Sequence, residues 1–198
     1  MLALVAGAAL AGCTDTDPGQ AIPANGSGNA APPGGGAPTS IAVPPRPSEL
    51  SLTGVDACKL FTAAQLDELK VNRTRGRSSA SEIYRGAPEC VLNVNAKEPF
   101  YDYTASLITT EGVEPWLSGK RNVDAKLVSI EGFPAASFVI GGDSDANFRC
   151  TTSVGVAGGQ QLMIAIDPHT KKAFSGEQLC QMSQQAATLA MQTLKTLK

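Results

Sequence analysis

The chain changes composition abruptly at Glu49, and this change limits what can fold. Residues 14–48 contain eight prolines and six glycines in 35 positions, with only three large apolar residues. Such a segment cannot bury enough apolar surface to offset the entropy lost on ordering. We therefore expect a disordered tether over residues 13–48. One folded domain is expected over residues 49–198, a length sufficient for one buried core.

The N-terminal residues resemble an export signal. Residues 2–11 form an uncharged apolar run of signal-peptide length, too short to span a hydrocarbon core of ~30 Å as a helix. No basic residue precedes the run, so we expect the natural start to lie upstream. The run leads into a Leu-Ala-Gly-Cys motif that ends at Cys13 and is similar to the lipobox of bacterial lipoproteins. We predict a signal peptide over residues 1–12 and acylation of Cys13, for example by palmitate.

Acylation of Cys13 would place the protein on the outer, extracytoplasmic face of the cell membrane. Each buried methylene contributes roughly 0.8 kcal/mol of membrane affinity, so several acyl chains hold stably where one binds weakly. Lysine and arginine number 16 and aspartate and glutamate 18, which gives a net charge of −2. This balance argues against nucleic acid as a partner. The expected contacts are the membrane, through the lipid, and an envelope protein or glycan.

Two motifs predict helices at opposite ends of the domain. Thr62 and Gln65 form a capping-box pattern that opens a short helix ending near Lys70. Ser175 and Gln178 form a second one, followed by apolar residues at helical spacing to the end of the chain. We therefore predict a short N-terminal helix and a long C-terminal helix.

Between the helices, apolar and polar residues alternate with a period of two, which indicates strands with one covered and one wetter face. The predicted strands lie near residues 90–96, 101–110, 124–130, 136–140, 148–156 and 160–167. Alternation of this kind is typical of antiparallel sheets. The long helix has only this sheet to cover its apolar side, so the predicted fold class is α+β, with an antiparallel sheet packed against the two helices.

Four cysteines remain after Cys13, an even number that predicts disulfide staples in an exported chain. They are Cys58, Cys90, Cys150 and Cys180. Cys90 and Cys150 lie on predicted strands with their side chains toward the core, whereas Cys58 and Cys180 lie near helix starts. We expect Cys90 to pair with Cys150 and Cys58 with Cys180. No Cys-x-x-Cys spacing occurs, so we expect no metal site at these residues.

The cysteine pattern resembles a known family. The stretch from Asp56 to Thr62, Asp-Ala-Cys-Lys-Leu-Phe-Thr, and the later positions of Cys90, Cys150 and Cys180 are similar to those of a group of actinobacterial lipoproteins defined as a domain of unknown function. The resemblance covers residues 49–198. It implies a signal peptide, a lipid-bearing cysteine, a tether and an extracytoplasmic domain, and it implies no catalytic residues.

The residues offer little catalytic chemistry. Residues 143–147 place oxygen side chains at alternate positions but lack the glycine and glutamate of a calcium loop, so a turn is expected there. His169, the single histidine, is expected in a solvated loop, and no Gly-x-Ser-x-Gly motif accompanies it. We therefore expect no enzyme activity, no catalytic residue, no metal and no cofactor.

Two further groups of residues are ambiguous. Arg73, Arg75, Arg77 and Arg85 form a basic stretch, expected to be a mobile solvated loop; the alternative is a contact for an anionic glycan or lipid headgroup. Trp116, with aromatic residues at positions 100, 101 and 103, either lines a ligand cleft or packs the sheet.

The predicted function is a lipid-anchored, non-enzymatic binding module of the cell envelope. The alternative is a carrier or scavenger of a small, lipid-like ligand, with a pocket between sheet and helix.

Overall fold

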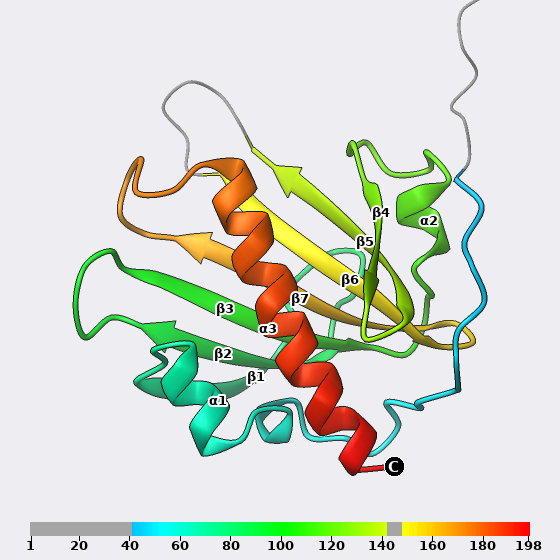
Figure 1. Cartoon of the computed structure of the whole chain (residues 1–198), viewed down its shortest axis with the longest axis horizontal. Helices are drawn as coiled ribbons and strands as arrows, with labels where there is room; N and C mark the ends of the chain where they lie inside the picture. Colours follow the sequence, from blue (N-terminus) through cyan, green and yellow to red (C-terminus); the bar gives the residue numbers. More distant parts are fainter. Residues whose placement is uncertain (1–40, 142–147) are drawn as a thin grey trace, which may run out of the picture. The chain divides into compact units, whose positions relative to one another are not determined.

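The computed structural model describes residues 41–141 and 148–198, which form one antiparallel sheet with a long helix across one face (Figure 1). The strands are β1 (Arg73–Ser78), β2 (Pro88–Val94), β3 (Tyr101–Ile108), β4 (Lys126–Ile130), β5 (Phe133–Ile140), β6 (Arg149–Ala157) and β7 (Gln160–Pro168). The helical segments are η1 (Ala57–Lys59), α1 (Ala63–Glu68), α2 (Glu114–Leu117) and α3 (Gly176–Thr196).

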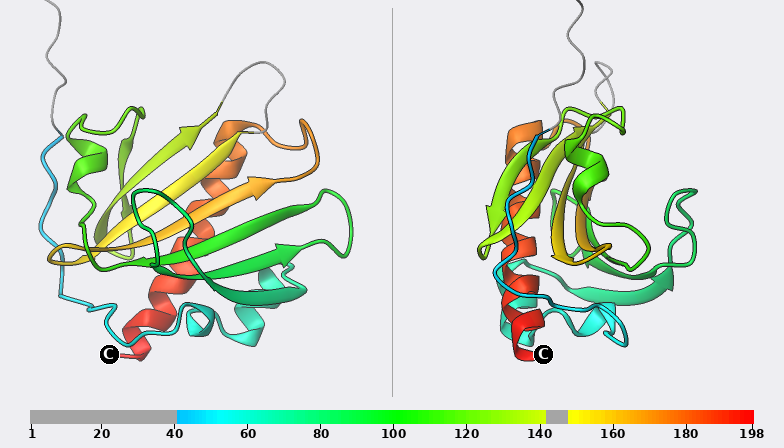
Figure 2. Two further views of the ribbon diagram at one scale, coloured as in Figure 1. Left: turned by 180° about the vertical axis from the view of Figure 1, so that it is seen from behind. Right: turned by 90° about the vertical axis from the view of Figure 1, so that its right-hand side faces the viewer.

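The sheet order is β1-β2-β3-β7-β6-β5-β4, and every neighbouring pair is antiparallel. α3 crosses the middle of the sheet, whereas the β1–β2 connection and α2 lie on the opposite side (Figure 2). The predicted α+β class is therefore confirmed. One sheet face is covered along its length, and the other is covered only at its margins.

Both capping-box helices are confirmed. The Thr62 hydroxyl accepts a hydrogen bond from the Gln65 backbone at 3.3 Å, and the Gln65 side chain accepts one from the Thr62 backbone at 2.8 Å. Ser175 and Gln178 make the same reciprocal pair at the start of α3, at 3.2 and 2.8 Å. Each box satisfies backbone donors that the first helical turn would leave unpaired.

All six predicted strands are present with shifted ends, and one strand was missed. Arg73–Ser78 is β1, an edge strand whose six residues are all exposed. The prediction of a mobile solvated loop there was wrong for Arg73, Arg75 and Arg77. An edge strand needs no apolar alternation because its side chains can stay in water on both faces, so the hydrophobic pattern carried no signal.

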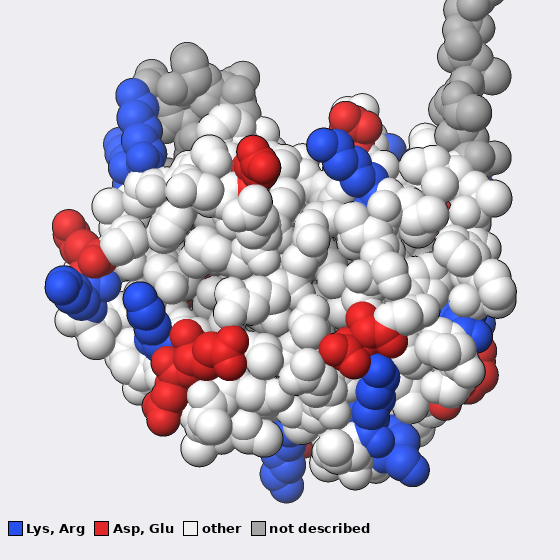
Figure 3. Space-filling model, in the orientation of Figure 1, with Lys and Arg blue, Asp and Glu red and all other residues white. Residues whose placement is uncertain are grey.

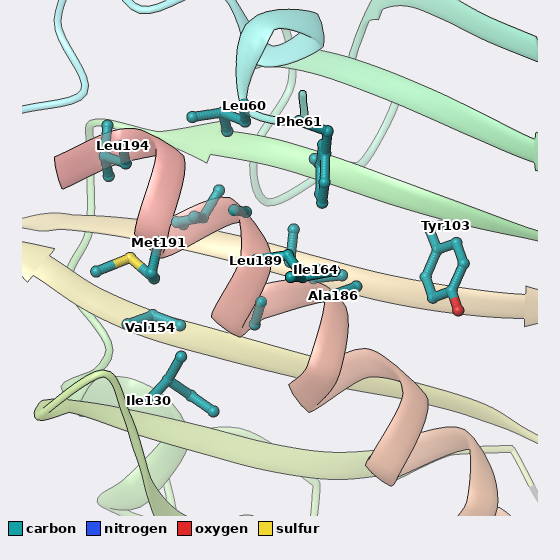
Figure 4. Close-up of a cluster of buried hydrophobic side chains, with 14 of the residues drawn as sticks. Leu60, Phe61, Tyr103, Ile130, Val154, Ile164, Ala186, Leu189, Met191 and Leu194 are labelled. Atoms are coloured by element: carbon teal, nitrogen blue, oxygen red, sulfur yellow. The ribbon is translucent and has the colours of Figure 1, made fainter. Parts of the chain in front are cut away.

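The core lies between α3 and the sheet (Figure 4). Side chains from alternate positions of the central strands, such as Val154 and Ile164, meet Ala186, Ala190 and the rest of the apolar side of α3, and these four are fully buried. Small residues on α3 let the helix approach the sheet closely. The interior of this layer is therefore filled.

Two disulfides staple helical segments to strands, in a pairing different from the predicted one. Cys58 bonds to Cys90 and Cys150 bonds to Cys180, and the Cα atoms lie 5.0 Å apart in each pair. Cys90 and Cys150 do both face the core, but β3 and β7 separate their strands. Three strand spacings amount to about 14 Å, which exceeds the reach of a disulfide. Each cysteine therefore bonds to a helical segment beside its own strand.

The domain's contacts begin before the predicted boundary at Glu49. The backbone N–H of Ile41 donates to the carbonyl of Leu117 at 3.0 Å, and the Arg46 Nε atom lies 2.9 Å from a Glu49 carboxylate oxygen. Residues 41–48, expected in the tether, thus contact the domain. Cys13 and the predicted signal peptide and remaining tether lie outside the described residues.

The face that α3 covers carries charges of both signs around an uncharged centre (Figure 3). This mixed distribution leaves no concentrated patch of one sign on that face. Among the described residues, no helix combines the length and the apolar character needed to cross a membrane.

Candidate functional site

A groove of about 390 Å³ lies on the sheet face opposite α3. Its floor is made of short or slender side chains from the inner strands β3, β6 and β7, namely Thr104, Ser106, Thr151, Met163 and Ala165. The register sets these residues side by side: Ser106 lies opposite Met163, and Thr104 opposite Ala165. Because short side chains rise little above the sheet, the face is hollow here while larger residues stand around it.

A buried carboxylate lies at one side of the floor. Glu89, only 8% exposed, accepts a hydrogen bond from the Arg77 Nε atom at 2.8 Å and one from the Ser106 hydroxyl at 3.0 Å. A buried carboxylate needs such partners to offset its lost hydration. The Arg77 side chain remains about half exposed, so its guanidinium forms part of the rim.

An aromatic wall closes another side of the groove. The Trp116 and Phe138 rings are stacked with centroids 4.4 Å apart, and Tyr84 is tilted against Trp116 at 6.5 Å. Tyr84 comes from the β1–β2 connection, Trp116 from α2 and Phe138 from β5. The wall is therefore assembled from three segments that are distant in sequence.

Gln161, which is fully buried, holds this wall in place. Its carbonyl oxygen accepts the Trp116 indole N–H at 2.9 Å and also accepts from the Ser153 hydroxyl. Its amide nitrogen donates to the Gly112 carbonyl at 2.8 Å and to the Tyr84 hydroxyl at 3.1 Å. One side chain thus fixes two of the three aromatic residues.

A second set of contacts supports the wall from behind. Arg121 donates to both carboxylate oxygens of Glu111, at 2.7 and 2.8 Å, and its guanidinium lies 5.3 Å from the Trp116 ring centroid. The Tyr84 hydroxyl donates to Glu111 at 2.6 Å. Burial, and then the hydrogen bond to Glu111, raise the pKa of Tyr84 above its ordinary value, so this phenol stays protonated.

Two isoleucines at the rim remain open to water. Ile83 is 51% exposed and Ile140 is 42% exposed, and both line the groove. Ile83 is in the β1–β2 connection and Ile140 is at the end of β5. Exposed large apolar residues beside a hollow are typical of contact sites.

The groove ends in a row of polar residues. Asp102 accepts from the Asn93 side chain at 2.6 Å and lies 2.8 Å from the His169 Nε2 atom, and Arg149 pairs with Asp167. His169 is thus in a loop, as predicted, but bonded to a carboxylate. Within the described residues no hydroxyl or thiol forms a hydrogen bond with the His169 ring.

The aromatic residues considered in the sequence do not form one cleft. Tyr101 and Tyr103 lie on the helix side of the sheet, in the core, whereas Trp116 lies on the open side. The oxygen-bearing turn at residues 143–147 lies outside the described residues. No group of histidine, cysteine and acidic side chains suited to hold a metal occurs in the part of the chain that is described.

Two further hollows lie at the edges of the helix layer. One, of about 450 Å³, is lined by Pro99, Tyr101, Phe174 and Met182 among others, and the second, of about 640 Å³, lies between α3 and β5. Both are open at the margin of the sheet and neither enters the filled interior.

The sequence did not reveal the main residues of the groove. Glu89 and Gln161 lie on the open face of the sheet, each one position before a core residue, Cys90 and Leu162. A buried polar residue at such a position has no local signature in the sequence. Trp116 and Arg77 were named from the sequence as alternatives for ligand contact, and both line the groove. Ile83, a large apolar residue within a polar stretch, was a further signal.

Comparison with family models finds a match to the family described as "Protein of unknown function (DUF3558)", over residues 8–193. No curated protein and no solved structure matches the chain. The family description carries no activity or ligand, so the function has to be inferred from the groove.

Proposed function

The chain belongs to the DUF3558 family of proteins of unknown function, and from this premise we propose that it is a non-enzymatic binding module, held on the outer face of the cell membrane by a lipid on Cys13. The ligand is an envelope protein or glycan, and it binds in the groove on the open sheet face. The single observation that carries this proposal is the groove itself, with its fixed aromatic wall and exposed isoleucine rim.

The wall supports binding because it is rigid before any ligand arrives. Gln161 and the Glu111–Arg121 pair fix the orientations of Tyr84 and Trp116. A surface that is already ordered loses less entropy when a ligand binds. The aromatic and apolar walls supply contact area, and the polar floor supplies hydrogen-bonding groups that orient a ligand.

The rim supports the same proposal through its apolar exposure. Ile83 and Ile140 leave apolar surface in water that a ligand would cover, at roughly 25 cal/mol per Å² of area removed from water. The neighbouring Arg77 and Arg149 side chains offer charge-assisted hydrogen bonds to a polar part of the ligand.

The alternative function, a carrier of a small lipid-like ligand, is restricted to the edge of the helix layer. The layer between α3 and the sheet is filled by buried side chains, so a lipid tail does not fit inside it. The edge hollow lined by Tyr101, Phe174 and Met182 is the place where a small apolar ligand would bind. Native mass spectrometry of the protein purified from its own membrane tests this, because a carrier retains a bound lipid mass.

The binding proposal is tested with matched variants of two equally exposed apolar residues. Ile83 is 51% exposed at the groove, and Leu197 is 49% exposed at the end of α3. We expect Ile83→Ser to lose envelope components that the wild type enriches from detergent-solubilised membranes, and Leu197→Ser to keep them. Equal enrichment by both variants would place binding elsewhere.

A further inference from the structure

The edge strand β1 carries a feature that the groove does not use. It is six residues long and exposed throughout, whereas the strand at the other edge, β4, is five residues long and partly buried. Strand edges present unpaired backbone groups and are templates for another strand, so proteins usually cover or blunt them. In the described part of the chain, no helix or loop forms hydrogen bonds to the outer edge of β1.

The register shows which β1 backbone groups point outward. Ser78 lies opposite Pro88, which has no N–H, so these two residues are not a hydrogen-bonded pair. Because hydrogen-bonded and non-bonded pairs alternate, Arg73, Arg75 and Arg77 bond to β2. The N–H and C=O groups of the alternate residues, Thr74, Gly76 and Ser78, therefore turn away from β2.

Within the described ranges, none of these outward groups has a hydrogen-bond partner. The strand is also held rigidly in place. Asn72 donates its side-chain amide to Asn95 at 2.6 Å, and the Cys58–Cys90 disulfide fixes the neighbouring strand β2. The outer edge of β1 is therefore an ordered strand to which another strand can pair.

Three arginines lie on one face of this edge. The Cβ position of Gly76 points toward Cys58 on the helix side, so Arg73, Arg75 and Arg77 project on the open side of the sheet. Arg77 is paired with Glu89, whereas no described carboxylate lies within ion-pair distance of Arg73 or Arg75. The two free charges are two residues apart along the strand.

The row of arginines on one face of β1 determines which kind of strand can pair with this edge. A second copy of β1 would set arginines against arginines, which is destabilising, so the row disfavours self-pairing. A partner strand with acidic residues at alternate positions would instead place each carboxylate beside an arginine on the same face. Carboxylate–guanidinium pairs are strong and geometrically specific.

We propose that β1 is a docking edge for an extended acidic peptide segment, which adds to the sheet as an eighth strand and pairs two alternate carboxylates with Arg73 and Arg75. Main-chain hydrogen bonds to Thr74, Gly76 and Ser78 supply affinity, and the arginines supply specificity. The edge adjoins the groove, because Ser78 and Arg77 line both, but Arg73 and Arg75 do not line the groove. Peptide binding that depends on Arg73 and Arg75 can therefore be tested independently of the function proposed above.

The test uses the full chain in detergent and the end-blocked peptide Thr-Val-Asp-Val-Asp-Val-Thr. Its composition-matched control, Thr-Val-Asp-Asp-Val-Val-Thr, places the two carboxylates on opposite faces. We expect the first peptide to bind more tightly and to slow amide exchange at Thr74, Gly76 and Ser78. Amides of Arg73, Arg75 and Arg77, already bonded to β2, should change little.

Variants separate the charge contribution from the backbone contribution. The double variant Arg73→Glu and Arg75→Glu should bind the peptide roughly tenfold more weakly, because two cross-strand pairs become repulsive. The double variant Lys120→Glu and Lys126→Glu makes the same change in charge at exposed positions beside and on β4, the opposite edge strand, and should leave binding unaltered. Thr74→Pro removes one outward donor that β2 does not use and should weaken binding with β1 intact; if that variant fails to fold, an N-methylated peptide makes the same test.

Several outcomes would overturn the inference. They are equal binding of both peptides, no binding, or exchange changes located away from β1. Binding of phosphatidylglycerol vesicles through Arg73 and Arg75, with no preference between the peptides, would indicate a headgroup contact instead. A β1-mediated dimer in sedimentation would show that the edge pairs with itself.

Discussion

Gln161 shows how one buried amide determines the shape of a binding surface. It lies on a central strand, fully buried, and its two ends bond to Trp116, Ser153, Tyr84 and the backbone near α2. Removing one partner from such a set leaves several buried groups unsatisfied, which costs more than the bonds contribute.

We predict that Gln161→Ala lowers the free energy of unfolding by about 2–4 kcal/mol. Urea unfolding followed by the fluorescence of Trp116, the chain's single tryptophan, measures it. Gln181→Ala, at an exposed position of α3, is the control and should cost no more than about 0.5 kcal/mol. Equal effects of the two changes would show that the amide does not hold the wall.

The three tyrosines give a second prediction at this scale. Burial raises the pKa of Tyr84, Tyr101 and Tyr103 above the ordinary value of about 10, and Glu111 adds to the rise at Tyr84. The folded state therefore holds phenol protons that the unfolded state releases. Stability is therefore retained below about pH 10 and lost as the pH rises beyond it.

Absorbance at the tyrosinate band measures this directly. We expect the native protein to show little tyrosinate at pH 10, where the chain in guanidinium is about half ionised. Ionisation should then accompany alkaline unfolding. Superimposable native and denatured titration curves would contradict the burial of these rings.

Among the helices and strands, features set by neighbouring residues were predicted from the sequence, whereas features set by contacts between distant segments were not. The capping boxes at Thr62 and Ser175 gave both helix starts, because a cap depends on residues within one turn. The alternation of apolar and polar residues locates strands but does not give their order in the sheet. Because the order sets the distance between Cys90 and Cys150, the disulfide pairing could not be predicted without it. The exposed strand β1 was missed because its polar side chains have no preferred face.

The disulfides provide the corresponding prediction. Non-reducing peptide mapping should recover Cys58 linked to Cys90 and Cys150 linked to Cys180. Because the linked residues are 32 and 30 positions apart, replacing either pair with alanine should cost a similar amount, roughly 3–4 kcal/mol in the chain-entropy model. Recovery of a Cys90–Cys150 peptide would contradict the strand order itself.

At the scale of the whole molecule, the groove could not be predicted because its parts meet only in the folded sheet. Glu89 comes from β2, Trp116 from α2 and Phe138 from β5, and no short motif joins them. Residues such as Thr104 contribute to the groove because their short side chains leave the sheet face hollow, and this role has no signature in the sequence. The period-two alternation and the helical spacing did predict the α+β class of the folded part.

The proposed anchor is tested at this scale too. We predict that Cys13→Ser moves the protein from the membrane fraction to the soluble fraction and abolishes labelling by an alkyne analogue of palmitate. Thr14→Ala, next to the modified residue, should leave both unchanged. Membrane retention of the unlabelled Cys13→Ser variant would show that something other than the lipid holds the protein.

The central claim, that the open-face groove is where a ligand binds, is tested most directly by photo-crosslinking in intact cells. A benzophenone amino acid is placed at Ile83 in one strain and at the equally exposed Leu197 in another. We predict a defined crosslinked product from position 83 and none from position 197. No product at position 83, or the same products from both positions, would contradict it.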